Sequence, residues 1–449
     1  MWSMNIARAI AFVLAGLSVA ASGQTYITYS NAGSLSQVWT QSMGSAVTTQ
    51  PVVQQIQSPT FPLSYETLFL GVQGSTHGFF YGLKADDGTT LWSFNLPTGV
   101  SPTGTPILVP GASGTRPPLV VFLASNGCAY AVDMTSSGSA SAYWSYCPSG
   151  YTVAAIAYDS YNIAVYAGIN PSSGAGYAVE LNLSSGTAAW TSTSLGDQVV
   201  AVAATGGWLG GGVTLTTLSA LYQLDTSGSV LGSPVSMPET PTASLFTAVI
   251  GDFAFTQDLC PPAYDNRLDF AIIPAGSSVY YSQLSASGPG ALQYQSLGYS
   301  ITAASAYDAS SIGTTRVHRD PDSGLLVGCT TGFASAISFS PLSNGSVAGV
   351  RFSWAQFPIS QGAESASVSA VPLYYLLDET SFTAQGTVLA ASGDNVVGVR
   401  DPIGAHETIW TDCASIVGYT SETGVVSVVQ RIYFADSAGG VYAISPGGI

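Results

Sequence analysis

The stretch Leu83–Trp92, which reads LKADDGTTLW, decides how this chain folds. It contains a short β-strand, a turn built from Asp and Gly, and a second strand that ends in Trp, which is the pattern of a β-hairpin. A repeat of ~40 to 60 residues with one such hairpin per period predicts the blades of a β-propeller, because each small sheet buries its faces only against its neighbours. Weaker copies of the phrase end at Trp39, Trp144, Trp190, Trp354 and Trp410.

The third strand of each repeat is the most regular, with small and large apolar residues in alternation. Such alternation places one face of each strand against a neighbouring sheet. We predict an all-β chain that forms a single β-propeller of about eight four-stranded blades, with seven as the alternative because the copies between Leu224 and Leu297 are weak. The third strands include Tyr81–Leu83, Tyr130–Asp133, Tyr177–Glu180, Leu221–Asp225, Val397–Asp401 and Val441–Ile444.

The two ends of the chain supply complementary parts of one blade. After Trp410 the sequence offers three strands, near Gly424–Val429, Ile432–Ala435 and Val441–Ile444, but no fourth strand with a Trp. The segment Gln37–Gln41 has that missing character. We predict that this N-terminal strand joins the C-terminal strands and closes the ring, which removes exposed sheet edges.

The composition indicates a large core and a weakly charged surface. Of 449 residues 46% are hydrophobic and only 8% are charged, and the formal net charge is -16. An acidic chain without a basic run repels phosphate backbones and anionic membranes. Nucleic acid is therefore excluded as an expected partner.

Residues 1–23 have the pattern of a secretory signal. Arg8 precedes the apolar run Ala9–Ala20, and the small residues Ala21 and Gly23 suit cleavage before Gln24. The run is short for a membrane span, and an uncleaved anchor is the alternative. We expect a propeller domain over residues 24–449 that is secreted or periplasmic, monomeric, and without a membrane span in the mature chain.

Five cysteines in an exported chain suggest up to two disulfides and one remaining thiol. Cys128 and Cys147 lie in successive strands, so hairpin pairing brings them opposite each other, and they are the expected disulfide. The pairing of Cys260, Cys329 and Cys413 stays open. Their scattered spacing offers no zinc or redox motif.

The phrase DDGTTLW at Asp86–Trp92 resembles the repeat of the quinoprotein alcohol dehydrogenase-like, or PQQ-like, β-propeller family, and the resemblance covers Gln37–Ile444. It implies either pyrroloquinoline quinone enzymes or non-catalytic scaffold propellers. Quinone dehydrogenases of this family usually combine an adjacent Cys-Cys disulfide, a calcium held by Glu, Asn and Asp, and an Asp base. This chain has no adjacent cysteines, and no such constellation transfers onto it. We expect no catalytic residues and no cofactor, with a divergent quinoprotein oxidoreductase that uses pyrroloquinoline quinone and calcium as the alternative.

A second resemblance involves calcium. Gly251-Asp252-Phe253, followed by Asp265–Phe270, resembles the Asp-rich loop of integrin-type propeller repeats. Arg267 stands at the loop centre, however, and the only obvious oxygen ligands are Asp265, Asn266 and Asp269. An ordinary turn is the favoured interpretation.

The remaining polar candidates have mostly structural interpretations. His77, His318 and His406 are too separated for a local metal motif, and Asp320–Gly324 reads as a solvated turn. The acids Asp86, Asp87, Asp133 and Asp225 fall in hairpins, where we expect them to cap turns. The sequons Asn182-Leu183-Ser184 and Asn344-Gly345-Ser346 are candidates for glycosylation in a host that glycosylates.

The chain is rich in tyrosine, with 24 residues that include Tyr280-Tyr281 and Tyr374-Tyr375. In a propeller most of these rings fill contacts between blades, although exposed rings stack on sugars or bind extended peptides. The leading hypothesis is an exported non-enzymatic propeller that binds a protein or glycan through loops on one rim. The alternatives are an enzyme whose residues gather from separate blades and an outer-membrane barrel, for which the repeat is too long.

Overall fold

All regular elements that the structure describes are β-strands, so the predicted all-β propeller fold is confirmed. Among these residues there is no helix with the length and apolar character needed to cross a membrane. The computed structural model describes residues 35–57, 64–112, 114–159, 162–205, 209–242, 245–250, 268–297, 300–308, 323–329, 333–341, 347–358, 369–377, 384–392, 395–401, 407–413, 416–421, 431–436 and 438–446.

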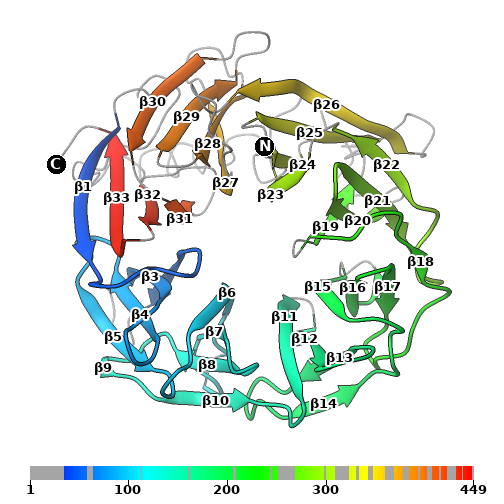
Figure 1. Cartoon of the computed structure of the whole chain (residues 1–449), viewed down its shortest axis with the longest axis horizontal. Coiled ribbons are helices and arrows are strands. Elements are labelled where there is room, and N and C mark those ends of the chain that lie inside the picture. Colours follow the sequence, from blue (N-terminus) through cyan, green and yellow to red (C-terminus); the bar gives the residue numbers. More distant parts are fainter. Residues whose placement is uncertain are drawn as a thin grey trace, which may run out of the picture.

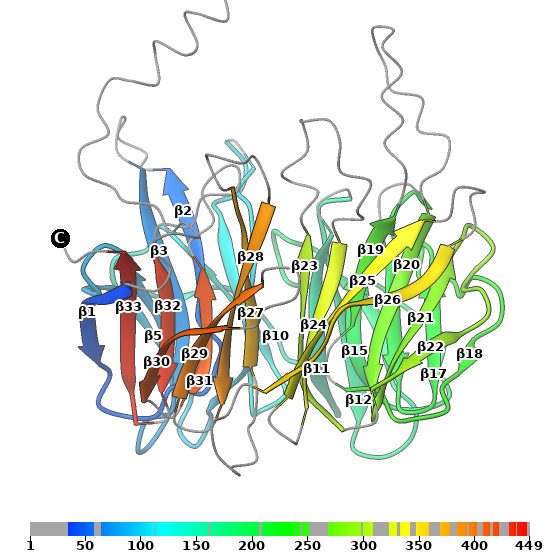
Figure 2. The same ribbon diagram turned by 90° about the horizontal axis from the view of Figure 1, so that it is seen from above.

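The described strands pair into eight sheets that stand side by side in a ring (Figure 1). Within each sheet the neighbouring strands are antiparallel, except for one short parallel pair in which Trp92 lies opposite Gly138. The strands run between the two faces of the ring (Figure 2). We call the sheets blades 1 to 8 and give their strands from the centre outward.

The first four blades are built from residues 52–236. Blade 1 is β2 (Val52–Gln57), β3 (Ser64–Val72), β4 (Phe79–Lys84), β5 (Thr90–Asn95) and β9 (Gly138–Ser139). Blade 2 is β6 (Pro102–Val109), β7 (Leu119–Ala124), β8 (Ala129–Asp133) and β10 (Ala142–Tyr146). Blade 3 is β11 (Tyr151–Asp159), β12 (Ala164–Pro171), β13 (Tyr177–Leu181) and β14 (Ala188–Thr191). Blade 4 is β15 (Val199–Ala204), β16 (Val213–Thr217), β17 (Ala220–Leu224) and β18 (Val235–Ser236).

The last four blades complete the ring. Blade 5 is β19 (Phe246–Ile250), β20 (Leu268–Ala275), β21 (Ser278–Leu284) and β22 (Gln293–Ser296). Blade 6 is β23 (Ile301–Asp308), β24 (Ser323–Cys329), β25 (Phe333–Pro341) and β26 (Val347–Pro358). Blade 7 is β27 (Ser369–Leu377), β28 (Ala384–Ser392), β29 (Asn395–Asp401) and β30 (Glu407–Cys413). Blade 8 is β31 (Ile416–Ser421), β32 (Ile432–Asp436), β33 (Gly440–Pro446) and β1 (Leu35–Ser42).

Blade 8 combines the two ends of the described chain. Strand β1, which contains the predicted segment Gln37–Gln41, pairs with β33 so that Trp39 lies opposite Ala443. The strand predicted near Gly424–Val429 falls outside the described residues, and the innermost strand of this blade is β31 instead.

The core lies between the blades, where apolar faces of adjacent sheets meet. Between blades 1 and 2, the ring of Phe80 stacks on Phe122 with 3.7 Å between their centroids, and Trp92 is fully buried beside them. Burial of apolar area of this kind contributes about 25 cal/mol per Å². Each blade is therefore held mainly by its neighbours.

One contact repeats between successive blades and explains the Trp of the sequence phrase. The indole nitrogens of Trp39, Trp92 and Trp144 each donate a hydrogen bond to a carbonyl oxygen in the next blade's hairpin turn, at 2.8, 3.3 and 2.8 Å. A turn glycine packs against the ring: a Cβ on Gly88 would lie 2.7 Å from Trp39, and one on Gly186 would lie 2.7 Å from Trp144. The Asp/Gly turn and the Trp are thus two sides of one contact.

Candidate functional site

The two faces of the ring are built from different connections. One face carries two kinds of connection: the hairpin between the second and third strand of each blade, and the segment that leads from one blade into the first strand of the next. Backbone hydrogen bonds join them, from Ser125 to Ser101 at 2.8 Å and from Val153 to Gly127 at 2.9 Å. The opposite face carries the turns between the first and second strand and between the third and fourth strand of each blade.

We call the first of these the neutral face, because its described connections contain no Lys or Arg and only two acids, Asp197 and Glu239. Of the five basic residues in the described part of the chain, Lys84, Arg116 and Arg431 lie on the opposite face, which we call the charged face, and Arg351 and Arg400 lie within strands β26 and β29. The neutral face comprises residues 43–51, 73–78, 96–101, 125–128, 147–150, 172–176, 192–198, 218–219, 237–242, 276–277 and 438–439. The charged face comprises residues 84–89, 110–112, 114–118, 133–137, 159, 162–163, 182–187, 209–212, 225–234, 285–292 and 431.

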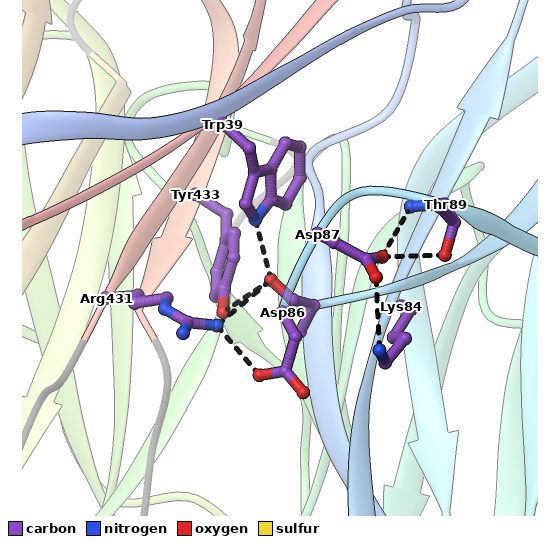
Figure 3. A network of polar contacts seen from close by, with 8 residues as sticks. Trp39, Lys84, Asp86, Asp87, Thr89, Arg431 and Tyr433 are labelled. Carbon is purple, nitrogen blue, oxygen red and sulfur yellow. Dashed lines mark hydrogen bonds and ion pairs between the residues drawn. The ribbon is translucent and has the colours of Figure 1, made fainter. Parts of the chain in front are cut away.

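The charged face holds a polar network between blades 8 and 1 (Figure 3). The guanidinium of Arg431 lies 2.9 Å from the carboxylate of Asp86 and also donates to the carbonyl of Ala85 at 3.3 Å. Next to it, Lys84 pairs with Asp87 at 3.1 Å. Arg431 joins blade 8 to blade 1, whereas the Lys84–Asp87 pair lies within the blade 1 hairpin, and an exposed ion pair of this type contributes less than about 1 kcal/mol.

Three of the four acids predicted to cap turns do so. Asp87, Asp133 and Asp225 each accept the backbone N–H two residues later, at 3.0, 2.8 and 2.8 Å. The hydrogen bond from the Thr89 hydroxyl lowers the pKa of Asp87 to about 2. Asp86 differs, because it pairs with Arg431 instead. These carboxylates stabilise hairpins, as expected for Asx turns.

A buried carboxylate lies between blades 3 and 4. Asp159 is 2% exposed, and its Oδ2 accepts the side-chain amide of Asn162 at 2.9 Å, which in turn donates to Gly210 of blade 4 at 3.4 Å. Burial, reinforced by the nearby carboxylates of Asp159 and Glu180, raises the pKa of the Tyr166 hydroxyl. That tyrosine stays protonated. The hydrogen bonds from Asn162 to Asp159 and to Gly210 join blades 3 and 4. Among the described residues, no three His, Cys, Asp or Glu side chains are placed to hold a metal ion.

Aromatic rings extend along the strands that border the neutral face. His77 and Phe79 lie 4.6 Å apart between centroids, and Tyr151 contacts Tyr177 at 5.8 Å. In blade 5 the ring of Tyr294 lies 5.7 Å from buried Tyr280 and is itself 64% exposed.

Near this pair, a glycine turn is shaped around a carboxylate. Glu239 Oε2 accepts the N–H of Ser277 at 2.9 Å, and a Cβ on Gly276 would lie 1.9 Å from the same oxygen. Only glycine permits so close an approach. One of the two acids of the neutral face is thereby fixed in a backbone hydrogen bond.

The predicted disulfide between Cys128 and Cys147 is confirmed, with 4.4 Å between the Cα atoms. It ties the 125–128 hairpin to the 147–150 connection, so it lies on the neutral face. Beside it, Asn126 donates to the Tyr130 hydroxyl at 2.8 Å and accepts the N–H of Cys128 at 3.2 Å. Cys329 and Cys413 are the last residues of β24 and β30, and Cys260 lies outside the described residues.

The remaining predicted site residues are spread over the ring. Asp269 is in β20, opposite Val249 and Leu284, whereas Asp265 and Asn266 lie outside the described residues, as do His318, His406 and Asn344. His77 is half-buried on the neutral face, and Asn182 is exposed in a hairpin turn on the charged face. Of the calcium and histidine candidates, the structure therefore describes only Asp269 and His77, which lie in different blades.

Sequence reasoning missed the contacts that join distant segments. Arg431 and Asp86 are 345 positions apart, and nothing local marks them as partners. The exposure of Tyr294 was also missed, since its phrase resembles those of buried rings.

The quinoprotein resemblance can be tested against the residues that line the ring. The quinone is a polycarboxylate that needs cationic donors, and calcium needs several oxygen ligands. The described innermost strands of the eight blades contain no Lys or Arg, and their only acids are Asp159, which Asn162 engages, and Asp308 at the end of β23. These residues do not fit the quinone and its calcium, and no catalytic step is derived through them.

Comparison with known proteins supports the fold alone. No protein family model matches the chain, and no curated protein matches it. Among solved structures it is similar to Sqt1 of Saccharomyces cerevisiae, with TM-score 0.55, 10% identity, and 92% of this chain and 100% of that chain covered. The Dos1 propeller gives TM-score 0.52 and 10% identity over 92% of this chain and 96% of that chain. The quinohemoprotein alcohol dehydrogenase of Comamonas testosteroni gives 0.51 and 12% over 94% of this chain and 78% of that chain.

Proposed function

We propose that this chain is an exported, non-enzymatic β-propeller that binds a protein or glycan through the loops of its neutral face. One observation carries the proposal: the described connections of that face contain no Lys or Arg. They expose hydroxyl, amide and glycine-turn groups, with aromatic rings on the strands that border them. Loops held on a rigid ring are the usual place for recognition.

The chemistry of this face favours an uncharged or weakly basic ligand surface. Hydroxyl and amide groups recognise partners by hydrogen bonds, and the aromatic rings on the bordering strands add stacking. The net charge of -16 disfavours polyanions. Ionic recognition therefore has little part in the proposed binding.

The covalent structure of the neutral face supports the proposal of export. The disulfide between Cys128 and Cys147 fixes two adjacent connections relative to each other, and disulfides persist in oxidising compartments. Pre-ordered loops lose less conformational entropy on binding.

The test compares two matched pairs of substitutions at exposed Ser and Thr positions. Ser173→Arg with Thr193→Arg alters the neutral face, and Ser137→Arg with Thr226→Arg alters the charged face. Each immobilised variant is offered the extracellular protein fraction and the polysaccharide fraction of the source culture. We expect both variants to melt like the parent, and only the neutral-face pair to lose the retained component. Equal retention by both variants would contradict the proposal.

A divergent quinoprotein oxidoreductase is the alternative, and it rests on a likeness of fold. Native mass spectrometry of the purified protein with pyrroloquinoline quinone and calcium distinguishes the two. The proposal expects no stoichiometric gain in mass. A gain of one quinone per chain would replace it with the enzyme.

A further inference from the structure

Four hairpin turns of the charged face share one local design, which reads Asx-x-Ser/Thr. In each turn, Oδ1 of the first residue accepts the backbone N–H of the third. The four turns are Asp87-Gly88-Thr89, Asp133-Met134-Thr135, Asn182-Leu183-Ser184 and Asp225-Thr226-Ser227, with N···O distances of 3.0, 2.8, 2.9 and 2.8 Å.

The side chain of Asn182 carries an amide nitrogen where the Asp side chains of the other three turns carry a second carboxylate oxygen. Capping uses only the Oδ1 acceptor, so Asn and Asp do the same structural work. In the Asp turns the carboxylate oxygen also accepts the Ser or Thr hydroxyl, at 2.6, 2.7 and 2.6 Å. At Asn182 the second atom of the group is an amide nitrogen, and within the described residues it makes no hydrogen bond.

The backbone around Asn182 is held firmly while its side chain is exposed. The carbonyl of Leu183 accepts the indole N–H of Trp144 at 2.8 Å, and the N–H of Gly186 donates to the Asn182 carbonyl at 2.7 Å. Leu183 is 8% exposed, whereas Asn182 and Ser184 are exposed. The turn therefore presents the amide nitrogen outward with the Ser184 hydroxyl group two residues away.

We propose that Asn182 is an N-glycosylation site, an inference that rests on the proposed export. The donor is an oligosaccharide carried on a polyprenyl pyrophosphate. The bond between the anomeric carbon and the pyrophosphate oxygen breaks, and that oxygen keeps the electron pair. The anomeric carbon forms a bond to Nδ2 of Asn182, and the proton lost from Nδ2 passes to a base of the transferase.

The position of this glycan follows from the two faces. Asn182 lies in the turn between β13 and β14, on the charged face. A glycan there leaves the neutral face uncovered. Glycosylation and ligand binding through the neutral face are thus compatible.

The experiment supplies a host leader and expresses residues 24–449 through the secretory pathway of an N-glycosylating eukaryotic host. Mass and peptide maps are recorded before and after peptide-N-glycosidase treatment. The parent is expected to carry a glycan at Asn182. Asn182→Asp, which restores the residue of the sister turns, is expected to lose that glycan and to keep its melting temperature within about 2 °C, because a capping acceptor is retained.

A matched gain-of-site variant keeps the test decisive. Asp225→Asn produces the sequon Asn-Thr-Ser in a sister turn with the same Oδ1 bond, and we expect it to acquire one additional glycan. A folded, secreted parent with unmodified Asn182 would overturn the proposal, and a glycan at position 225 of the Asp225→Asn variant would show that the same host does modify such a turn. Secretion of a reporter fused to residues 1–23 tests export separately, so the two proposals fail independently.

Discussion

The indole nitrogen of Trp39 donates a hydrogen bond to the carbonyl oxygen of Ala85 at 2.8 Å. Trp39 belongs to the outer strand of blade 8, and Ala85 begins the hairpin turn of blade 1. The same carbonyl also accepts Arg431 at 3.3 Å and Tyr433 at 3.4 Å (Figure 3). A single backbone oxygen of blade 1 thus contacts β1 from the N-terminal end and the start of β32 from the C-terminal end of the described chain.

Removal of the Trp39 side chain is expected to weaken this junction strongly. Trp39 is 8% exposed, and replacement of a buried Trp by Ala lowers the free energy of unfolding by about 3–5 kcal/mol. Urea unfolding of Trp39→Ala measures the loss. Trp39→Leu, which keeps apolar volume but loses the donor, should lose less, and equal losses would show that packing plays no part.

Gly88 and Gly99 form a matched pair for testing the turn contact. Both have positive φ, at 73° and 77°, but a Cβ on Gly88 would meet the Trp39 ring whereas one on Gly99 would meet nothing within 4 Å. Gly99→Ala is expected to lose about 1–2 kcal/mol through its backbone conformation alone. Gly88→Ala should lose about 1–3 kcal/mol more through overpacking, and equal losses by urea unfolding would contradict the contact.

Substitution of Trp92 and of Tyr294 compares the stability contributed by a buried and by an exposed aromatic side chain. Trp92 is fully buried and Tyr294 is 64% exposed. Trp92→Ala is expected to destabilise the protein by about 3–5 kcal/mol and Tyr294→Ala by less than about 0.5 kcal/mol. If Trp92→Ala melts like the parent, the placement of β5 is wrong.

The disulfide closes a loop with a sequence separation of 19 residues. Loops of this length give about 3 kcal/mol of stabilisation in the chain-entropy model. The variant Cys128→Ala with Cys147→Ala should lose that amount in urea unfolding and should no longer respond to a thiol reductant. Loss of the same stability on reduction of the double variant would point to another cysteine pair.

Asp87 makes the stability of the fold depend on pH, with a loss of stability at acidic pH. Its pKa falls from 3.8 to about 2 in the folded protein, chiefly through the Thr89 hydroxyl. Because the pKa is lower in the folded state, the ionised carboxylate stabilises the fold at pH values above the pKa of the unfolded state. This contribution disappears as the pH falls from about 4 to about 2. The melting temperature of the parent should therefore fall more steeply over that window than that of Asp87→Ala. Parallel curves would show that the carboxylate does not stabilise the turn.

Much of the fold is local and therefore readable from the sequence. The phrase at Leu83–Trp92 contains both halves of the contact between blades, the Asp/Gly turn and the Trp, so it predicts strand, turn and packing together. The Trp of Gln37–Gln41 likewise matched the strand missing from the C-terminal blade, and β1 pairs with β33. Cys128 and Cys147 were found because hairpin geometry alone brings them together.

The candidate site was less readable, because a face is a property of the assembled ring. The connections 96–101 and 172–176 look alike as loops, and only the antiparallel order of every blade places them on the same side. The pair of Arg431 and Asp86 also depends on closure across the whole chain. Charges that are unremarkable in sequence therefore separate into a neutral and a charged face only in three dimensions.

The most direct test of the central claim is amide hydrogen exchange of the protein with and without its retained ligand. Binding through the neutral face predicts slower exchange in residues 96–101, 125–128, 172–176 and 192–198. Protection confined to the charged-face turns at 85–89, 134–137, 182–187 and 225–229 would contradict it.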